Sequence, residues 1–161
     1  HRHGLFRVDA PDDCLGVAWW LPPTKPAARS VAGDQWRTCL ALTRLVLHPE
    51  LPTNAASFLL GRSIRRIRHE GRWTHLVTYA DERQGHTGTI YRATNWEYAG
   101  PMKSAPVWLD SDGRQVSVLA TRTRTYAEME QLGYTKHPGS VKHKFTMTLP
   151  AARRMPLGAA A

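Results

Sequence analysis

Long apolar runs, cysteines and glycine-rich loops are scarce in this sequence of 161 residues. No apolar run approaches the roughly 18 residues of a membrane span, and we expect neither a membrane segment nor a secretory leader. The two cysteines, Cys14 and Cys39, are too few for a disulfide framework or a four-cysteine zinc site. We therefore expect both to be reduced residues near the core of a cytoplasmic protein.

Acidic residues are also few, because 13 Asp and Glu stand against 22 Lys and Arg and leave a formal charge of +9. This excess favours a polyanionic partner such as nucleic acid. Apolar residues at 42% and charged residues at 22% are ordinary for a globular domain. We expect one domain over residues 1–150 and a flexible tail over residues 151–161, where alanines show no core-facing pattern.

The apolar pattern predicts an α/β (α+β) protein with a mixed central sheet flanked by helices. The clearest element is a helix over residues 55–68, because Leu60, Ile64 and Ile67 recur at helical spacing and Gly71 follows. Residues 22–37, with three prolines, are predicted to be a loop. The predicted strands are 14–21, 39–47, 73–80, 96–99 and 141–147, with a hairpin of 107–109 and 115–118, a short helix over 86–94, and a helix over 126–132 capped by Thr125 with Glu128.

Two charged residues lie at the carboxyl ends of predicted strands, where ligands of α/β sheets tend to bind. Arg44 interrupts the apolar run 39–47, and Asp81 terminates the strand 73–80. A buried arginine needs a partner. Arg44 therefore either forms an ion pair with Asp81 or Glu97, or holds a phosphate or carboxylate of a ligand.

The start of the helix over 55–68 is a second candidate. Backbone N–H groups at a helix N-terminus attract anions, and Ser57 lies one turn inside this helix. Alternatively, Thr53 or Asn54 simply caps the helix with its side chain. No glycine-rich phosphate loop supports the anion site.

The densest polar cluster follows Asp81. A carboxylate at a strand end can orient or deprotonate an amine, and His86 at a helix start is expected to stay neutral. Tyr91 and Asn95 are spaced to share one face of the predicted helix. The alternative is a capped helix in which Tyr91 and Trp96 are core aromatics.

His1 and His3, with Asp81 or His86, are one hypothetical ligand set for a divalent metal, although no tight ligand motif is present. Basic residues are interleaved with Trp, Tyr and His, a pattern typical of phosphate contacts with base stacking, or else of a solvated basic face. The basic residues are Arg62, Arg65, Arg66, Arg68, Arg72, Arg122, Arg124, Lys136, Lys142 and Lys144.

Four segments between residues 40 and 100 carry a resemblance. They read LTRLV (42–46), PTNAASF (52–58), LVTYAD (76–81) and GHTGTIYRATNWEYAG (85–100). In order and spacing they resemble the Mom DNA-modification proteins of bacteriophages, and residues 124–145 show a fainter similarity. The resemblance implies the fold of GCN5-related N-acetyltransferases. It also implies transfer of a carbamoylmethyl group to the exocyclic amine of adenine in phage DNA, which protects the DNA from host restriction.

By motif position, the resemblance implies catalytic roles for Arg44, Ser57, Asp81 and Tyr91. The donor would be bound by Thr53, Asn54 and Ser57. Contacts to double-stranded DNA would come from His86, Asn95, Trp96, Arg62, Arg65, Arg66, Arg122, Arg124, Lys142 and Lys144.

The donor of the added group stays open between acetyl-CoA and another acyl or aminoacyl donor, and iron is also associated with the family. Residues 48–55 contain no glycine where a typical acetyltransferase has its pyrophosphate loop. The first strand and helix of that fold would lie upstream of His1 or be absent. A homodimer is left open. Two rival functions also stay open: an ordinary N-acetyltransferase of a small-molecule or protein amine, and a non-catalytic basic DNA-binding protein.

Overall fold

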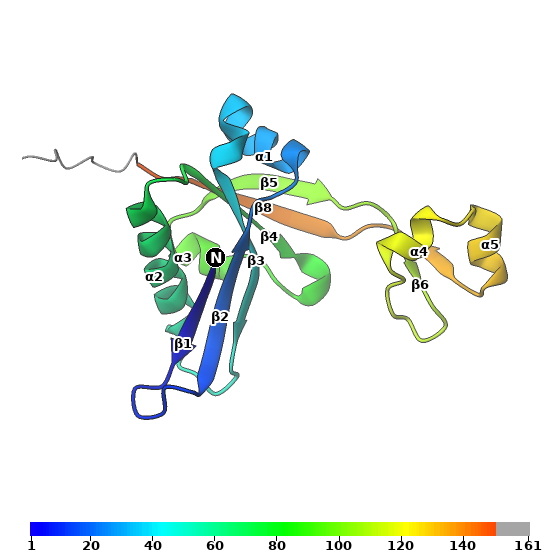
Figure 1. The fold of residues 1–161 in the computed structure, drawn as a ribbon. Helices are drawn as coiled ribbons and strands as arrows, with labels where there is room; N and C mark the ends of the chain where they lie inside the picture. Colours follow the sequence, from blue (N-terminus) through cyan, green and yellow to red (C-terminus); the bar gives the residue numbers. More distant parts are fainter. Residues whose placement is uncertain (151–161) are drawn as a thin grey trace, which may run out of the picture.

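A computed structural model describes residues 1–150 of the chain. Its centre is a six-stranded mixed sheet of strand order β1-β2-β3-β4-β8-β5 (Figure 1). Helices cover both faces of the sheet, and the chain between β5 and β8 forms a separate lobe. The strands of the sheet are β1 (Arg2–Phe6), β2 (Cys14–Leu21), β3 (Cys39–Leu47), β4 (His75–Asp81), β5 (Glu97–Lys103) and β8 (Val141–Thr148), and the helices packed on it are α1 (Lys25–Ala32), α2 (Ala55–Glu70) and α3 (Thr89–Ala93).

The predicted helix over 55–68 is confirmed as α2, which links β3 to the parallel strand β4. Its buried residues, Leu60 and Ile67 among them, share one core cluster with Trp20 and Phe145 of the sheet. Full burial of such a side chain contributes about 1.5–3 kcal/mol. The helix ends at Gly71 in the left-handed conformation, with φ +66°, which a residue without Cβ adopts at little cost.

The prediction of a loop over residues 22–37 is wrong, because α1 and a 3-10 helix (Gly33–Thr38) lie there. Pro26 occupies the first turn of α1, where the missing N–H of proline breaks no helical hydrogen bond. Ala28 is buried on the sheet face opposite α2, in a second core cluster with Cys39. Pro26 therefore lies within the start of a helix instead of excluding one, and Pro22 and Pro23 precede that helix.

The two cysteines differ in environment. Cys39 is buried as expected, and burial raises the pKa of its thiol to about 11 against the opposing effect of the Lys144 charge. Cys14 is exposed, so the expectation of a core position is wrong for it. It begins β2 at the end of the register with β1, opposite Phe6.

The predicted strands 14–21 and 39–47 are confirmed with unchanged boundaries as β2 and β3, and the predicted strands 73–80, 96–99 and 141–147 are confirmed with changed boundaries as β4, β5 and β8. β5 runs past Gly100-Pro101 to Lys103 because it is an edge strand, where a proline removes no necessary hydrogen bond. Gly100 has φ +98° and lies at an irregularity of the register with β8. The predicted helix over 86–94 is shortened to α3, and residues 2–6 form β1, an additional edge strand.

The lobe spans residues 104–140 (Figure 1). The predicted hairpin of 107–109 and 115–118 survives only as one bridge between Leu109 and Gln115, because β6 pairs with β7 instead. The capping box of Thr125 and Glu128 is confirmed. The elements of the lobe are β6 (Val107–Leu109), α4 (Val118–Arg122), α5 (Tyr126–Gln131) and β7 (Thr135–His137). The predicted tail, residues 151–161, lies outside the described residues.

Candidate active site

The parallel strands β3 and β4 separate halfway along their length. They pair only between Cys39–Ala41 and His75–Val77. The last link is the buried Thr78 hydroxyl, which donates to the Leu42 carbonyl at 3.2 Å. Beyond it, β3 pairs with β2 and β4 pairs with β8. The facing backbone edges are thus free to bond a ligand that enters between the strands.

An irregularity in β3 accompanies this separation. The β2–β3 register shifts so that Thr43 has no partner of its own, and its hydroxyl donates to the Trp19 carbonyl at 3.0 Å. Such bulges bend a strand and reverse its alternation. Leu42 and Leu45 accordingly both pack in the core beneath α2, and Arg44 lies on the opposite face.

Arg44 is exposed, which overturns the premise that it is a buried arginine. Its Nη1 donates to the Thr43 carbonyl at 3.1 Å, and within the described residues it pairs with neither Asp81 nor Glu97. The bulge turns the guanidinium out of the core. The expected ion pair is therefore absent, and Arg44 is available to a ligand.

Asp81 ends β4 on the same face as Arg44, since its neighbour Ala80 faces the α2 core. One carboxylate oxygen accepts from the Arg83 amide at 3.1 Å, and the other lies 3.5 Å from the Lys142 ammonium. Partial burial pushes the pKa of Asp81 upward, but hydrogen bonds from Ser140 and Arg83 and the charge of Lys142 outweigh it and lower the pKa. Asp81 is thus an ionised carboxylate at neutral pH.

Tyr91 lies on the other face of the sheet. Its ring packs against Trp96 and Phe145, with centroids 5.8 and 5.2 Å away. Burial raises the pKa of Tyr91, partly offset by a hydrogen bond with Thr78. Because Thr78 also bridges to β3 at the last link between the strands, the Tyr91 hydroxyl reaches the point where β3 and β4 separate.

A cavity of about 290 Å³ adjoins Tyr91 and is lined by Leu45 and residues 85–91, His86 included. The loop is held close to the core at Gly88, whose φ is +78° and where any Cβ would overlap the Phe145 ring. His86 and Tyr91 are therefore brought together as expected.

Asn95 and Trp96 depart from the expected arrangement. Asn95 follows α3 with φ +63°, so it does not share a helical face with Tyr91. Trp96 is 5% exposed and stacks on Trp20 at 6.3 Å. The expected DNA contact by Trp96 is wrong, because its ring belongs to the core, where its indole N–H has no partner among residues 1–150.

The N-terminus of α2 carries no side-chain cap. Asn54 is the N-cap residue and makes no capping bond, and the Ser57 hydroxyl donates to the Asn54 carbonyl at 2.9 Å. Thr53 and Asn54 are exposed. The predicted side-chain cap is therefore absent. The Ala55 amide donates to the Pro52 carbonyl at 2.9 Å, so the Ala56 and Ser57 amides are the ones that can face an anion.

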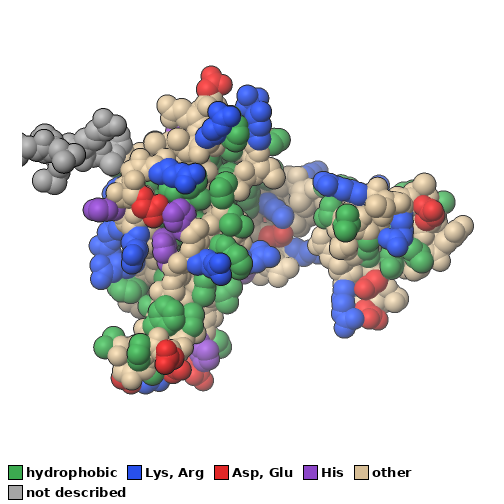
Figure 2. Space-filling model, viewed as in Figure 1, with side chains coloured by type: hydrophobic (Ala, Val, Ile, Leu, Met, Phe, Trp, Pro, Cys, Tyr) green, Lys and Arg blue, Asp and Glu red, His purple; other side chains and the backbone are tan. Residues whose placement is uncertain are grey.

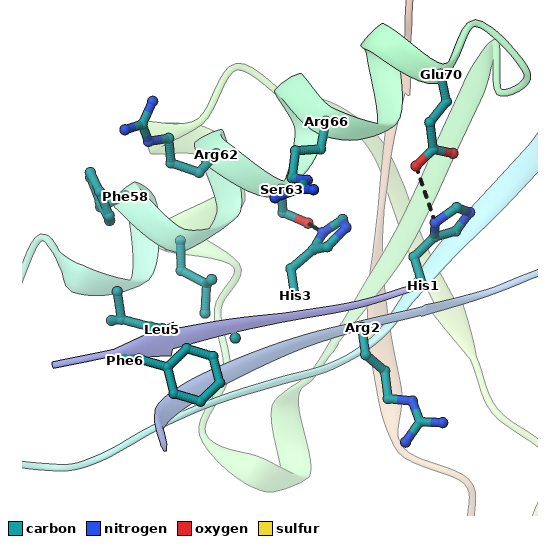
Figure 3. Close-up of a pocket in the computed structure, with 12 residues that line it drawn as sticks. His1, Arg2, His3, Leu5, Phe6, Phe58, Arg62, Ser63, Arg66 and Glu70 are labelled. Carbon is teal, nitrogen blue, oxygen red and sulfur yellow. Dashed lines mark hydrogen bonds and ion pairs between the residues drawn. The ribbon is translucent and has the colours of Figure 1, made fainter. Parts of the chain in front are cut away.

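His1 and His3 lie elsewhere, in a cavity of about 640 Å³ between β1 and α2 (Figure 3). His1 contacts Glu70 at 3.3 Å, and His3 bonds the Ser63 hydroxyl at 2.5 Å. Neither contacts Asp81 or His86, so the hypothetical metal set is not formed. Within residues 1–150 no three His, Cys, Asp or Glu side chains gather to hold a metal ion, and we derive no step through iron.

The expected DNA-binding cations are divided among three parts of the molecule (Figure 2). Arg62 and Arg66 line the cavity beside β1, and Arg65 is exposed on the same helix. On the sheet face that bears Asp81, Lys142 contacts this carboxylate and Lys144 bonds the Ser30 hydroxyl at 2.8 Å. The lobe supplies the other two, Arg122 and Arg124.

Sequence reasoning missed a pocket of about 280 Å³ between Asp81 and the lobe. On the lobe side it is lined by Trp108 and Gln115. On the other side it is lined by Lys142 of β8 and by Ser140, which precedes β8. No spacing in the sequence pointed to it, since its walls come from four separate segments between residues 81 and 142.

A crossover helix between parallel strands that separate, within a mixed sheet, defines a GCN5-related N-acetyltransferase-like (GNAT-like) α/β fold. A structure described as an acetyltransferase from Acinetobacter baylyi superposes with a TM-score of 0.56 and 13% identity over 97% of this chain and 64% of its own. The ribosomal-protein-alanine N-acetyltransferase of Brucella melitensis superposes with a TM-score of 0.55 and 14% identity, and the match covers 91% of this chain and 67% of that one. A Salmonella typhimurium structure, solved with acetyl-CoA, superposes with a TM-score of 0.53 and 11% identity, and the match covers 92% of this chain and 64% of that one. The expected fold is confirmed.

The chain belongs to the Mom protein family, whose sequence model matches residues 2–148. The methylcarbamoylase Mom of Escherichia phage Mu is 30% identical over 105 residues, which make up 62% of this chain and 43% of that protein. The chain thus spans less than half of this relative and about two thirds of the GNAT structures. No helix among residues 1–150 is long and apolar enough to cross a membrane.

Proposed function

We propose that this chain carries the catalytic domain of a DNA hypermodification enzyme of phage origin. It converts adenine in DNA to a carbamoylmethyl-type derivative on the exocyclic amine and so protects the DNA from host restriction. One observation carries the proposal: in a chain of the Mom family, Arg44 and Asp81 lie on one face of the sheet where β3 and β4 separate. The phage Mu relative is named a methylcarbamoylase.

Asp81 acts on the acceptor amine. The nitrogen of the adenine amine forms a bond to the methylene carbon of the incoming carbamoylmethyl group and loses one of its two hydrogens as a proton. In the same step the bond from that carbon to the donor's leaving group breaks, and the leaving group departs with the bonding electron pair. A carboxylate with a lowered pKa accepts a hydrogen bond from that amine and orients it. Asp81 lines the pocket of about 280 Å³, so a base in that pocket lies beside the carboxylate. Lys142, 3.5 Å from Oδ2, keeps the carboxylate ionised until the proton arrives.

Tyr91 and Arg44 act on the other reactant. The raised pKa keeps the Tyr91 hydroxyl protonated. Its single hydrogen points to Thr78 in the free protein, because the Thr78 hydrogen goes to the Leu42 carbonyl, and it turns to charge that develops where the strands separate. The guanidinium of Arg44, which forms no ion pair within residues 1–150, binds a carbonyl or anionic group bidentately. An enzyme gains rate by holding both reactants in this way.

The uncapped N-terminus of α2, with Thr53, Asn54 and Ser57, fits the anionic part of a donor such as acetyl-CoA. A related fold has been solved with acetyl-CoA. Acetyl-CoA alone would transfer only an acetyl group, so the donor of a carbamoylmethyl group must also supply its amide nitrogen and a leaving group on its methylene carbon. Another acyl or aminoacyl donor fits the same amides, because the segment before α2 lacks the glycines that would select a pyrophosphate.

Expression beside a reporter plasmid tests the proposal. After digestion of the plasmid to nucleosides, mass spectrometry should detect a deoxyadenosine derivative heavier by one carbamoylmethyl group. Asp81→Asn and Arg44→Ala should each remove it, and Arg29→Ala on α1 should not. A folded wild-type chain that leaves deoxyadenosine unmodified would contradict the proposal, and activity in both site variants would show that the site is misplaced.

The same experiment separates the rivals. An ordinary N-acetyltransferase would acetylate an amine from acetyl-CoA and leave the plasmid unchanged. A non-catalytic DNA-binding protein would bind duplexes in a salt-dependent manner without altering any nucleoside. The acetyltransferase alternative draws support from the fold, and the family membership favours the DNA-modifying one.

A further inference from the structure

The lobe faces Asp81 across the pocket of about 280 Å³. Figure 1 shows the lobe beyond the ends of β5 and β8, and Figure 2 shows basic and acidic side chains between it and the body. An enzyme that alters a base within a duplex must extrude that base into a pocket. A pocket next to the candidate acceptor carboxylate is therefore the place to examine for base recognition.

The walls of this pocket carry the three chemical groups that a purine with an exocyclic amine requires. Trp108 offers an aromatic surface for stacking, and its ring packs edge-on against Tyr126 with centroids 5.0 Å apart. Gln115 is exposed and offers a side-chain amide. Such an amide accepts a hydrogen bond from the exocyclic amine of adenine and donates one to adenine N7. Asp81 can accept the second hydrogen of the same amine.

We propose that this pocket receives an extruded adenine, with Trp108 stacking on the base, Gln115 reading its amine and N7, and α4 filling the space it leaves in the duplex. The inference rests on the proposed function and assigns the base-binding role to the lobe. Guanine carries a carbonyl where adenine has its amine, so Gln115 and the Asp81 carboxylate both disfavour it.

The role of α4 follows from its exposed apolar side chains. Val118 lines the pocket and is 57% exposed, and the next residue, Leu119, is 75% exposed. Arg122 lies one turn further along α4 and Arg124 two residues beyond it. Apolar side chains flanked by cations are the elements that proteins insert between base steps while they hold the phosphates.

Fluorescence anisotropy with short labelled duplexes tests the inference. One duplex is fully paired, and the others carry adenine, guanine or thymine opposite an abasic site, where extrusion breaks no base pair. We expect the adenine duplex with the abasic site to bind about tenfold more tightly than its guanine and thymine counterparts. Gln115→Ala should reduce the difference between adenine and guanine, with Asp81 accounting for what remains, and Trp108→Ala should lower affinity for all three.

Leu119→Ala should weaken binding of the fully paired duplex about fivefold, the order of one lost stacking contact. Leu132→Ala is the matched control, since Leu132 is 51% exposed on the same lobe and does not line the pocket. If Trp108→Ala unfolds the lobe, Trp108→Phe keeps an aromatic surface and should retain the preference for adenine.

The outcomes separate the two proposals. Equal affinity for the three abasic duplexes, unchanged by Gln115→Ala, would overturn the base pocket and leave salt-dependent DNA binding in place. Failure to bind any duplex at low salt would overturn the DNA-directed function itself. A plasmid that is modified normally by the Gln115→Ala and Leu119→Ala variants would uphold the proposed function and refute the base pocket.

Discussion

Two tryptophans determine how the histidines beside β1 are held. An indole N–H only donates. The Trp20 N–H donates to the Ser63 hydroxyl at 2.6 Å, which leaves the Ser63 hydrogen for His3 Nδ1. The Trp73 N–H donates to His1 Nε2 at 3.0 Å, and this directs His1 Nδ1 toward Glu70. His3 is thereby held as a neutral ring.

Acid should destabilise the fold through His3. Burial, with the charge of Arg66, lowers the pKa of His3 in the folded state below its ordinary 6.5. The unfolded chain therefore binds the proton more readily than the folded protein. The stability that neutral His3 contributes to the folded state is complete above pH 6.5 and is lost as the pH falls through the folded-state pKa. Urea unfolding should show a lower free energy of unfolding at pH 5 than at pH 7.5, and the His3→Gln variant should show a smaller difference between the two pH values.

His69→Gln is the control for this measurement, because His69 is exposed at the end of α2. It should leave the pH dependence as in the wild type. An identical loss of stability in the His3→Gln variant would contradict the assignment to His3.

At the scale of single elements, the loop before α3 depends on two glycines of unlike surroundings. Gly85 and Gly88 have φ of +70° and +78°. A Cβ at Gly85 would meet nothing within 4 Å, whereas one at Gly88 would overlap the Phe145 ring. Both glycines avoid backbone strain, and only Gly88 also permits the close approach to the core.

Gly88→Ala should therefore destabilise the protein more than Gly85→Ala. Backbone strain alone costs about 1–2 kcal/mol at either position, and the overlap at Gly88 adds about 1–3 kcal/mol of overpacking. The midpoints of urea unfolding measure the difference. Equal midpoints in the two variants would show that the 85–91 loop does not depend on its contact with Phe145.

The sequence predicts elements well where one periodic face is buried. The α2 helix and the strands around it follow from apolar spacing, because each buries a complete stripe or face. The bulge at Thr43 left no such signal, and the burial of Arg44 was wrongly predicted for that reason. A bulge depends on how two strands twist together, which the residues of one strand do not reveal.

Pairing between strands that are far apart in the sequence could not be predicted for a similar reason. The turn Asp110–Gly113 forms, with the Arg114 amide bonded to the Asp110 carboxylate at 2.8 Å, so the local signal was correct. β6 nevertheless pairs with β7, a strand from residues 135–137. Trp96 shows the same limit among site residues, since spacing cannot separate a stacked core ring from an exposed one.

At the scale of the whole molecule, the positive charge is divided between the α2 side, the sheet face with Asp81, and the lobe (Figure 2). A duplex that delivers a base to the pocket beside Asp81 must lie against the lobe, since the lobe forms one wall of that pocket. Its phosphates then meet Arg122 and Arg124 and remain distant from the turn that joins β1 and β2 (Figure 1).

Salt dependence measures which cations take part. Each phosphate contact contributes a slope of about 0.9 to the fall of log affinity with log salt concentration. Arg122→Ala and Arg124→Ala should each reduce the slope by about 1 for any duplex sequence. Arg7→Ala should leave it unchanged, because Arg7 lies between β1 and β2 and pairs with Asp9 at 2.6 Å. An equal reduction by all three variants would mean that the charge acts at long range and that the lobe does not contact the DNA.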